Sequence, residues 1–300
     1  LARQLFGVGE AVQGAGATSI VMELRLPRIL AAILVGAALA VAGGAFQSLL
    51  RNPLADPYVL GTSSGAALGA AIAILLPIGG VAWELGGVQL AAFIGALASV
   101  GLVWRVAGIG SGEERIASVL LVGYAVASLL AAALSLVMLM SGANLRAIFS
   151  FLLGGLDGAT WPRLAAAALP LIAATTLLAL RGRALAGFLL GDEAAQHLGV
   201  DVRRERRIAV ALASLATAAA VALAGLVGFV GLVVPHLVRL AVGPDPRAVL
   251  PLSAIGGALL LLLADTIARS IGVPVGVVTA LIGAPFLLWL LHRARTGYAL

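Results

Sequence analysis

The stretch LRLPRILAAILVGAALAVAGGAFQSLLRNPLADPYVLGTSSG, residues 24–65, decides the fold. Two arginines flank a proline at its start, a long and almost uninterrupted apolar run follows, and prolines and glycines punctuate its end. An apolar run of about 20 residues can cross the hydrocarbon core of a bilayer as one helix. We therefore expect a transmembrane helix over 29–50, ended by the prolines that follow it.

Eight further apolar segments continue this pattern, separated by glycine, proline and arginine. The chain is 62 % hydrophobic and 11 % charged, whereas soluble domains are roughly 25 % charged. Because the seventh segment holds Gly228, Gly231 and Pro235, we expect it to be an interrupted or partial crossing. The sequence thus predicts an all-α polytopic membrane protein, one transmembrane domain over 1–300, with about nine spans at 29–50, 63–78, 88–107, 116–140, 162–180, 208–224, 226–241, 248–268 and 275–291.

The composition excludes several classes of function. The sequence contains no cysteine and no lysine, so all 19 basic residues are arginines. Thiolate metal sites and cysteine nucleophiles are therefore excluded, and so is the lysine of a nucleotide-hydrolysing P-loop. The arginines lie singly or in short clusters, without the continuous basic face of a nucleic-acid-binding protein. His197, His236 and His292 show no metal-ligand spacing, so we expect no metal or cofactor on this chain, and a structural role for His236 such as bonding a carbonyl that Pro235 frees.

The arginines also orient the spans. Most of them fall in one alternate set of loops, and arginine-rich loops lie on the cytoplasmic side of a membrane. This rule places residues 181–207 and the C-terminus in the cytoplasm, and residues 1–28 outside it. The sequence begins with Leu1 and shows no secretory signal, which predicts one more helix upstream. The expected location is the cytoplasmic (inner) membrane.

Two further stretches carry more than hydrophobicity: LGDEAAQHLGVDVRR at 190–204, and the region 225–285 with GFVGLVVPHLVRL, LLLADTIARS and VPVGVVTALIGAP. Together with residues 24–65 they resemble the permease family of type II ABC importers for cobalamin, iron–siderophores and haem. The resemblance runs from about residue 20 to 293. It implies the ten-helix permease fold, here without its first helix, and a homodimer around a central pathway. The implied partners are two cytoplasmic subunits that bind ATP and Mg²⁺, and an extracytoplasmic substrate-binding protein.

The 192–200 segment belongs to the longest polar stretch of the chain. Asp192 is a good helix N-cap, Glu193 suits the helix dipole, and Gly199 suits the left-handed position after a helix. With Asp201 as the next cap, we expect two short helices joined by a tight turn. Ala194, Ala195 and Leu198 are expected to share one face, small enough for close approach by a partner. The residues alone also allow a solvated connection. The resemblance implies a coupling contact with the ATPase subunit through Asp192, Glu193, Ala194, Ala195, His197, Leu198 and Gly199.

The 51–57 loop, RNPLADP, follows the first span on the predicted cytoplasmic side. Pro53 and Pro57 remove backbone donors and favour extended or turn geometry. These residues alone allow a simple helix-breaking loop. The resemblance implies that Asn52, Pro53 and Leu54 belong to the inner gate of the pathway, and that residues 108–114 correspond in position to a second gate element.

Three arginines, Arg25, Arg28 and Arg269, lie on the predicted outer side against the general trend. Contact with lipid headgroups is one interpretation. The guanidinium fork also suits electrostatic docking of carboxylates, and the resemblance matches these positions to arginines that face the binding protein. Asp265 lies four residues before Arg269, so the two are expected to form an ion pair on one helix.

Asp265 and residues 61–65 also allow two functions other than that of an importer permease. A secondary transporter or channel would use ionisable groups inside the membrane, for which Asp265 is a poor single candidate. An intramembrane serine hydrolase is the remote alternative, because residues 61–65 match G-x-S-x-G; that pattern needs a preceding strand, whereas close helix packing needs only its small residues. The expected function is the permease of an importer for a bulky metal chelate, an iron–siderophore or a cobamide, with haem next.

Overall fold

The computed structural model describes residues 20–76, 86–107 and 113–295, and within these ranges it contains helices and no strand. The predicted lead-in before residue 20, the predicted upstream helix and residues 108–112 of the second gate element lie outside the described residues. The α-helices are α3 (Leu26–Leu49), α4 (Thr62–Leu75), α6 (Gly87–Ala107), α7 (Glu113–Met140), α8 (Leu145–Leu152), α9 (Trp161–Leu180), α10 (Gly182–Leu189), α11 (Asp192–His197), α12 (Val202–Ala224), α13 (Val230–Val242), α14 (Pro246–Ile271) and α15 (Val275–Arg295). Single turns of π- or 3-10-helix are η1 (Ile20–Arg25), η2 (Pro57–Leu60) and η3 (Gly142–Asn144).

The predicted spans correspond to helices. Six are long and apolar enough to cross a membrane by length and composition, and the three shorter apolar ones are α4, α13 and α15. With 13 residues, α13 is about 20 Å long, less than the roughly 30 Å of a bilayer core. The all-α membrane fold is therefore confirmed, and the short α13 agrees with the expected partial seventh crossing.

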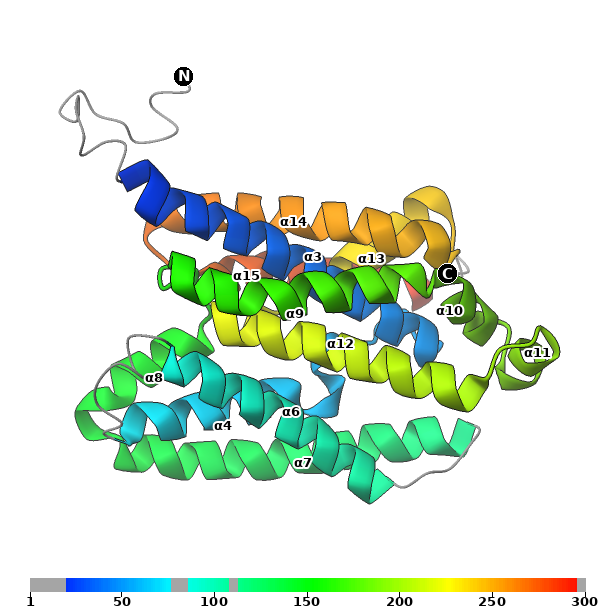
Figure 1. Ribbon diagram of the computed structural model, residues 1–300, viewed down its shortest axis with the longest axis horizontal. Coiled ribbons are helices and arrows are strands. Elements are labelled where there is room, and N and C mark those ends of the chain that lie inside the picture. The colour runs from blue at the N-terminus through cyan, green and yellow to red at the C-terminus, as the bar shows by residue number, and fades with distance from the viewer. Residues whose placement is uncertain (1–19, 77–85, 108–112, 296–300) are drawn as a thin grey trace.

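The helices form two groups with α12 between them (Figure 1). One group contains α3, α9, α13, α14 and α15; the other contains α4, α6, α7 and α8. Helix α12 packs against α3 and α9 on one side and against α4 and α6 on the other. Helices α10 and α11 project at one end of the bundle, and the starts of α3 and α9 lie at the opposite end with α8.

Glycines let two pairs of these helices approach closely. A Cβ added to Gly36 of α3 would lie 2.2 Å from the Gly257 oxygen of α14, and one added to Gly65 of α4 would lie 2.3 Å from the Gly95 oxygen of α6. Such small-residue contacts are typical of helix packing in membranes. Residues 61–65 thus start a packed helix, with no strand before them among the described residues, which removes the basis of the serine-hydrolase alternative.

Two segments without α-helix bring the chain back into the bundle. Residues 50–61 return from the end of α3 to the start of α4, and residues 225–229 return from the end of α12 to the start of α13. The two segments meet where the Tyr58 hydroxyl donates to the Val227 carbonyl at 2.9 Å. Irregular backbone at membrane depth is tolerated where protein buries it or where it lines a cavity.

The contact between α3 and α13 predicts a strong effect of substitution at Gly43. A Cβ added there would lie 1.8 Å from the Gly231 oxygen, so Gly43→Leu must push the two helices apart. Overpacking of this kind costs about 1–3 kcal/mol or more, and we expect a lower thermal unfolding midpoint of the purified chain. Gly101→Leu is the matched control, because a Cβ at Gly101 meets nothing within 4 Å. Equal midpoints for the two variants would contradict the packing described.

Candidate coupling, gate and docking surfaces

The 192–200 segment forms a short helix outside one end of the bundle. Helix α11 starts after Gly191 (φ +102°) and is followed by Gly199 in the left-handed region (φ +80°). Asp201 then caps α12 by accepting a hydrogen bond from the Arg204 backbone N–H at 3.0 Å. The predicted roles of Gly199 and Asp201 are confirmed. The helix after the turn is the 23-residue α12 rather than a short one, and the second short helix is α10, before α11.

Two predictions about α11 are wrong. Asp192 makes no capping hydrogen bond, because its carboxylate accepts from Arg206 at 2.6 Å, and the Arg206 guanidinium lies over the Phe188 ring. Ala195 is 0 % exposed, since it packs on Gly187 of α10, where an added Cβ would lie 3.4 Å away. It therefore does not share an exposed face with Leu198.

Two large apolar side chains are exposed at this end of the bundle. Leu190 and Leu198 are 67 % and 66 % exposed, and they line a hollow of about 600 Å³ together with residues of α10, of the start of α12 and Arg247 of α14. Asp245, at the start of α14, accepts from Arg247 at 2.8 Å, and these hydrogen bonds lower the pKa of its carboxyl. Exposed leucines beside charged groups are typical of a surface that a partner protein covers.

Hydrogen bonds fix the conformation of the 51–57 loop. The Asn52 side chain accepts from the Leu54 backbone N–H at 2.9 Å, and the Asn52 N–H donates to the Gln47 carbonyl at 3.1 Å. Asn52 is exposed and Pro53 and Leu54 are half-buried, so the three predicted gate residues lie together where α3 ends. Their role in a gate stays a prediction.

Gln47 is a buried polar residue beside the predicted gate that the sequence analysis did not single out. It is 2 % exposed, and its amide N–H₂ donates to the carbonyls of Ala55 and Leu232, both at 3.2 Å. Its oxygen accepts from Arg239 of α13. One side chain thus ties α3, the 51–57 loop and α13 together. An available signal was a glutamine inside the apolar run of α3.

The expectation that His236 bonds a carbonyl freed by Pro235 is wrong. Pro235 frees the Gly231 carbonyl in α13, and the Gln47 amide, not His236, lies 3.4 Å from it. Both His236 ring nitrogens are buried and unpartnered among the described residues. No group of three metal-ligating side chains occurs in the described part of the chain.

The 51–57 loop lies against the 192–200 segment. A Cβ added to Gly191, immediately before α11, would lie 3.8 Å from Arg51 Nη1. Arg51 has positive φ (+48°), a strained backbone for a residue other than glycine. The Arg51 side chain therefore connects the start of α11 with the start of the 51–57 loop, so a displacement of α11 can be transmitted to this loop.

The opposite end carries the three outer arginines. Arg28 binds Asp265 of α14 through Nη2 at 2.7 Å and Nε at 2.8 Å, and it also binds the exposed Asp157. The predicted pair of Asp265 with Arg269 is wrong: Asp265 is 3 % exposed and faces α3, whereas Arg269 is exposed. Because Asp265 is held in an ion pair by Arg28, it has a structural partner and gives a secondary transporter no support of its own. Arg25 is half-buried, directly before α3.

These features together fit a transport permease: a bundle of apolar helices interrupted by irregular segments, with exposed leucines beside a short helix outside one end. Residues 4–293 match the model of the FecCD transport family. The chain is 46 % identical over 289 residues to the cobalamin import system permease protein BtuC of Halobacterium salinarum, a match that covers 96 % of this chain and 76 % of that protein. It is 42 % identical over 280 residues to the hemin transport system permease protein HmuU of Yersinia pestis, covering 91 % and 83 %. A solved structure of an ABC transporter assigned to the metal-chelate type, in an inward-facing conformation, matches with a TM-score of 0.86 and 30 % identity over 97 % of this chain and 95 % of that one.

The chain belongs to the FecCD transport family. It is a type II ABC importer permease, a multi-pass protein of the inner membrane that works with ATP-binding and substrate-binding partners. The resemblance seen in the sequence is thereby confirmed.

Proposed function

We propose that two copies of this chain form the translocation pathway of an ATP-driven importer for a bulky metal chelate, an iron–siderophore or a cobamide, with haem next. ATP and Mg²⁺ bind to two cytoplasmic partner subunits, because this chain has no lysine to complete a P-loop. The relatives named for cobalamin and hemin support this substrate class.

The observation that carries the proposal is the end of the bundle with α10 and α11. Exposed Leu190 and Leu198 surround a hollow there, and Arg51 lies against the start of α11. A partner that grips α11 can therefore act on the 51–57 loop. ATP binding closes the partner dimer, moves α11 and tilts the spans, and the inner and outer gates alternate.

The arginine distribution supports the orientation. Arg203, Arg204, Arg206 and Arg207 lie at the start of α12 beside α11, so this end faces the cytoplasm by the positive-inside rule. The C-terminal end of α15 lies at the same end of the bundle. We therefore propose that the C-terminus lies in the cytoplasm.

An uncovered face of α7 supports the homodimer. Helix α7 packs against α4, α6 and η2, while Leu121, Tyr124, Leu136 and Leu139 on it are 64–84 % exposed. A second copy would cover such a face and close a conduit between the subunits. Substrate selectivity then comes from the external binding protein. Binding assays of that protein with cobalamin, a ferric siderophore and haem identify the chelate.

A single cysteine tests the proposed coupling contact, because the chain has none of its own. Leu198→Cys should cross-link to the ATPase subunit in the assembled complex, whereas Leu139→Cys, which is also exposed but lies on α7, should not. If Leu198→Cys stays free while the complex is intact, the α11 end is not the ATPase contact.

Arg25 and Arg269 are the docking residues that the geometry leaves accessible. Changing both to Glu should slow association of the binding protein about tenfold or more at low salt, because exposed interface charges act mainly on the association rate. Surface-plasmon association rates at two salt concentrations measure this effect. Arg28→Glu instead leaves buried Asp265 beside a second carboxylate, so it should lower the yield of folded chain. An unchanged association rate of the Arg25→Glu, Arg269→Glu variant would contradict the docking role.

A further inference from the structure

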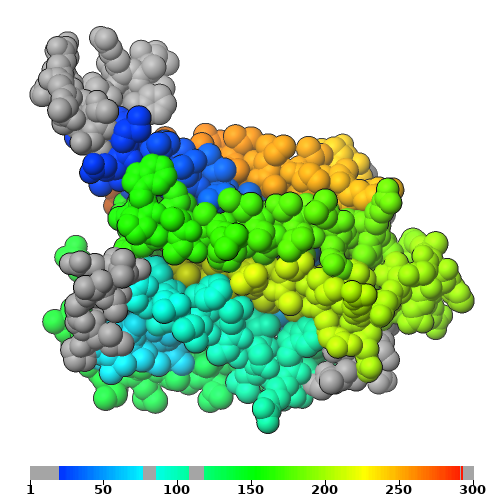
Figure 2. Space-filling view, viewed as in Figure 1, coloured from blue at the N-terminus to red at the C-terminus, as the bar shows by residue number. Residues whose placement is uncertain are grey.

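A groove on the side of the bundle is lined by residues to which the proposed transport function assigns no role. It runs between α6 and α9 with α12 as its floor, and α12 is visible there as a strip between the two helices (Figure 2). The hollow measures about 290 Å³. Its floor is formed by the buried Ala219, Ala222 and Leu223, and its walls by Leu90 and Phe93 of α6 and by Ala166, Ala167 and Pro170 of α9. These residues make an apolar trough with no charged member.

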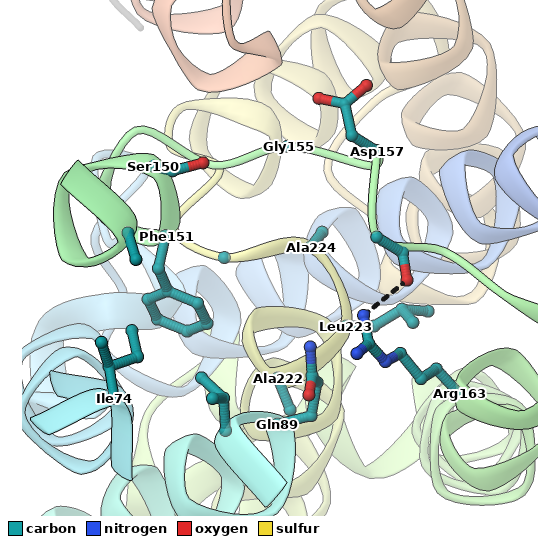
Figure 3. A pocket seen from close by; sticks show the side chains of 14 residues that line it. Ile74, Gln89, Ser150, Phe151, Gly155, Asp157, Arg163, Ala222, Leu223 and Ala224 are labelled. Carbon is teal, nitrogen blue, oxygen red and sulfur yellow. Dashed lines mark hydrogen bonds between the residues drawn. The ribbon is translucent and has the colours of Figure 1, made fainter. Parts of the chain in front are cut away.

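Two polar side chains close the trough at the end of the bundle opposite α11. Gln89 of α6 and Arg163 of α9 line both this groove and a second hollow of about 230 Å³ beside it. Figure 3 shows the two side chains pointing toward one another over Ala222. A Cβ added to Gly86 would lie 3.2 Å from Gln89 Oε1 and 3.7 Å from Arg163 Cγ, so both belong to one corner.

The hydrogen bonding of this corner is incomplete. Arg163 donates through Nη1 to the Gly158 carbonyl at 3.1 Å, but its Nε is buried without a partner, and so is Gln89 Oε1. Arg163 forms no ion pair with any described residue. Pro170 also lacks a backbone N–H, so the Ala166 carbonyl in the groove loses its usual helical donor. The corner offers a guanidinium donor and two acceptors to a ligand.

We propose that this groove binds one glycerophospholipid from the membrane leaflet at this end of the bundle. The lipid phosphate accepts from the Arg163 guanidinium, a headgroup hydroxyl or ammonium donates to Gln89 Oε1, and one acyl chain lies along the trough. Guanidinium–phosphate hydrogen bonds are among the strong ones. An apolar trough that ends at an arginine fits an amphipathic ligand, whose chain fills the trough, better than a soluble anion. The inference does not depend on what the chain transports.

The test titrates phosphatidylglycerol into the full chain, purified in detergent and stripped of lipid, with native mass spectrometry as the readout. One saturable lipid per chain is expected. Arg163→Gln should weaken its binding about tenfold, and Ala166→Trp should do the same by filling the trough from an exposed position. Diacylglycerol, without a phosphate, should bind about tenfold more weakly than phosphatidylglycerol, and inorganic phosphate should not displace the lipid.

Two matched controls lie outside the groove. Arg146→Gln changes an exposed arginine on α8, and Ala165→Trp adds the same bulk at an exposed position of α9 that does not line the groove; both should bind phosphatidylglycerol like the parent chain. Thermal unfolding midpoints show whether each variant is folded. If Arg163→Gln does not fold, the Ala166→Trp variant alone tests the proposal. Parent-like binding by the folded groove variants, or equal binding of diacylglycerol, would overturn the proposal.

Discussion

Gly199→Val should abolish ATP-driven uptake and substrate-stimulated hydrolysis together, while the complex still assembles in the membrane. Gly199 has φ +80°, and a β-branched residue in that region costs of order 1–3 kcal/mol or more. Helix α11 has only six residues and few contacts with which to offset this cost. Its C-terminal turn, with the exposed Leu198, should therefore lose its geometry. Uptake by reconstituted vesicles should fall more than tenfold.

The control for this prediction is Gly199→Asn. A Cβ at Gly199 meets nothing within 4 Å, so both substitutions test backbone conformation and not crowding. Asparagine tolerates the left-handed region, and its uptake should stay within about twofold of the parent chain. If the valine variant transports as well as the asparagine variant, the 192–200 segment is only a connection.

Gln47→Leu should loosen the inner end of the bundle. The leucine leaves Arg239 without its acceptor and the carbonyls of Ala55 and Leu232 without a donor. Leaving buried polar groups unpaired costs about 2–4 kcal/mol in total, which corresponds to a lower unfolding midpoint of roughly 5 °C or more. Because the lost hydrogen bonds hold the 51–57 loop, vesicles loaded with substrate should also leak it without ATP.

Gln196→Leu is the matched control for the unfolding midpoint, because it makes the same substitution at an exposed glutamine on α11. Its midpoint should stay at the parent value. A Gln47→Leu chain with the parent midpoint and no leak would show that the hydrogen bonds of Gln47 neither stabilise the fold nor hold the gate.

Local signals explain what could be predicted from the sequence. The spans follow from apolar runs, and the turn at Gly199 and the cap at Asp201 depend on residues within a few positions of each other. Helix α13 starts shortly after Gly228 and ends before Gly243, so local glycines also mark its bounds, whereas Gly231 and Pro235 lie inside it. Such features need no knowledge of the partner helix.

Long-range contacts explain what could not be predicted. Asp265 has a suitable arginine four residues away, yet it binds Arg28, 237 positions distant, because α14 turns that carboxylate toward α3. Ala195 was predicted to contact a partner protein, whereas it packs on α10. Because α10 was not predicted from the sequence, the contact that covers Ala195 could not be predicted either. The hydrogen bonds of Gln47 join residues up to 192 positions apart. An apolar run with one glutamine indicates a buried polar site but does not name its partners.

Uptake by proteoliposomes tests the central claim most directly. Vesicles should contain this chain with its ATPase subunits, and the binding protein loaded with the chelate that it prefers should be outside. Accumulation of that chelate should require MgATP on the ATPase side and should disappear in the Gly199→Val variant and when the ATPase is hydrolysis-deficient. Accumulation that proceeds without ATP, or that follows an imposed proton gradient, would contradict the assignment of this chain as the conduit of an ATP-driven importer.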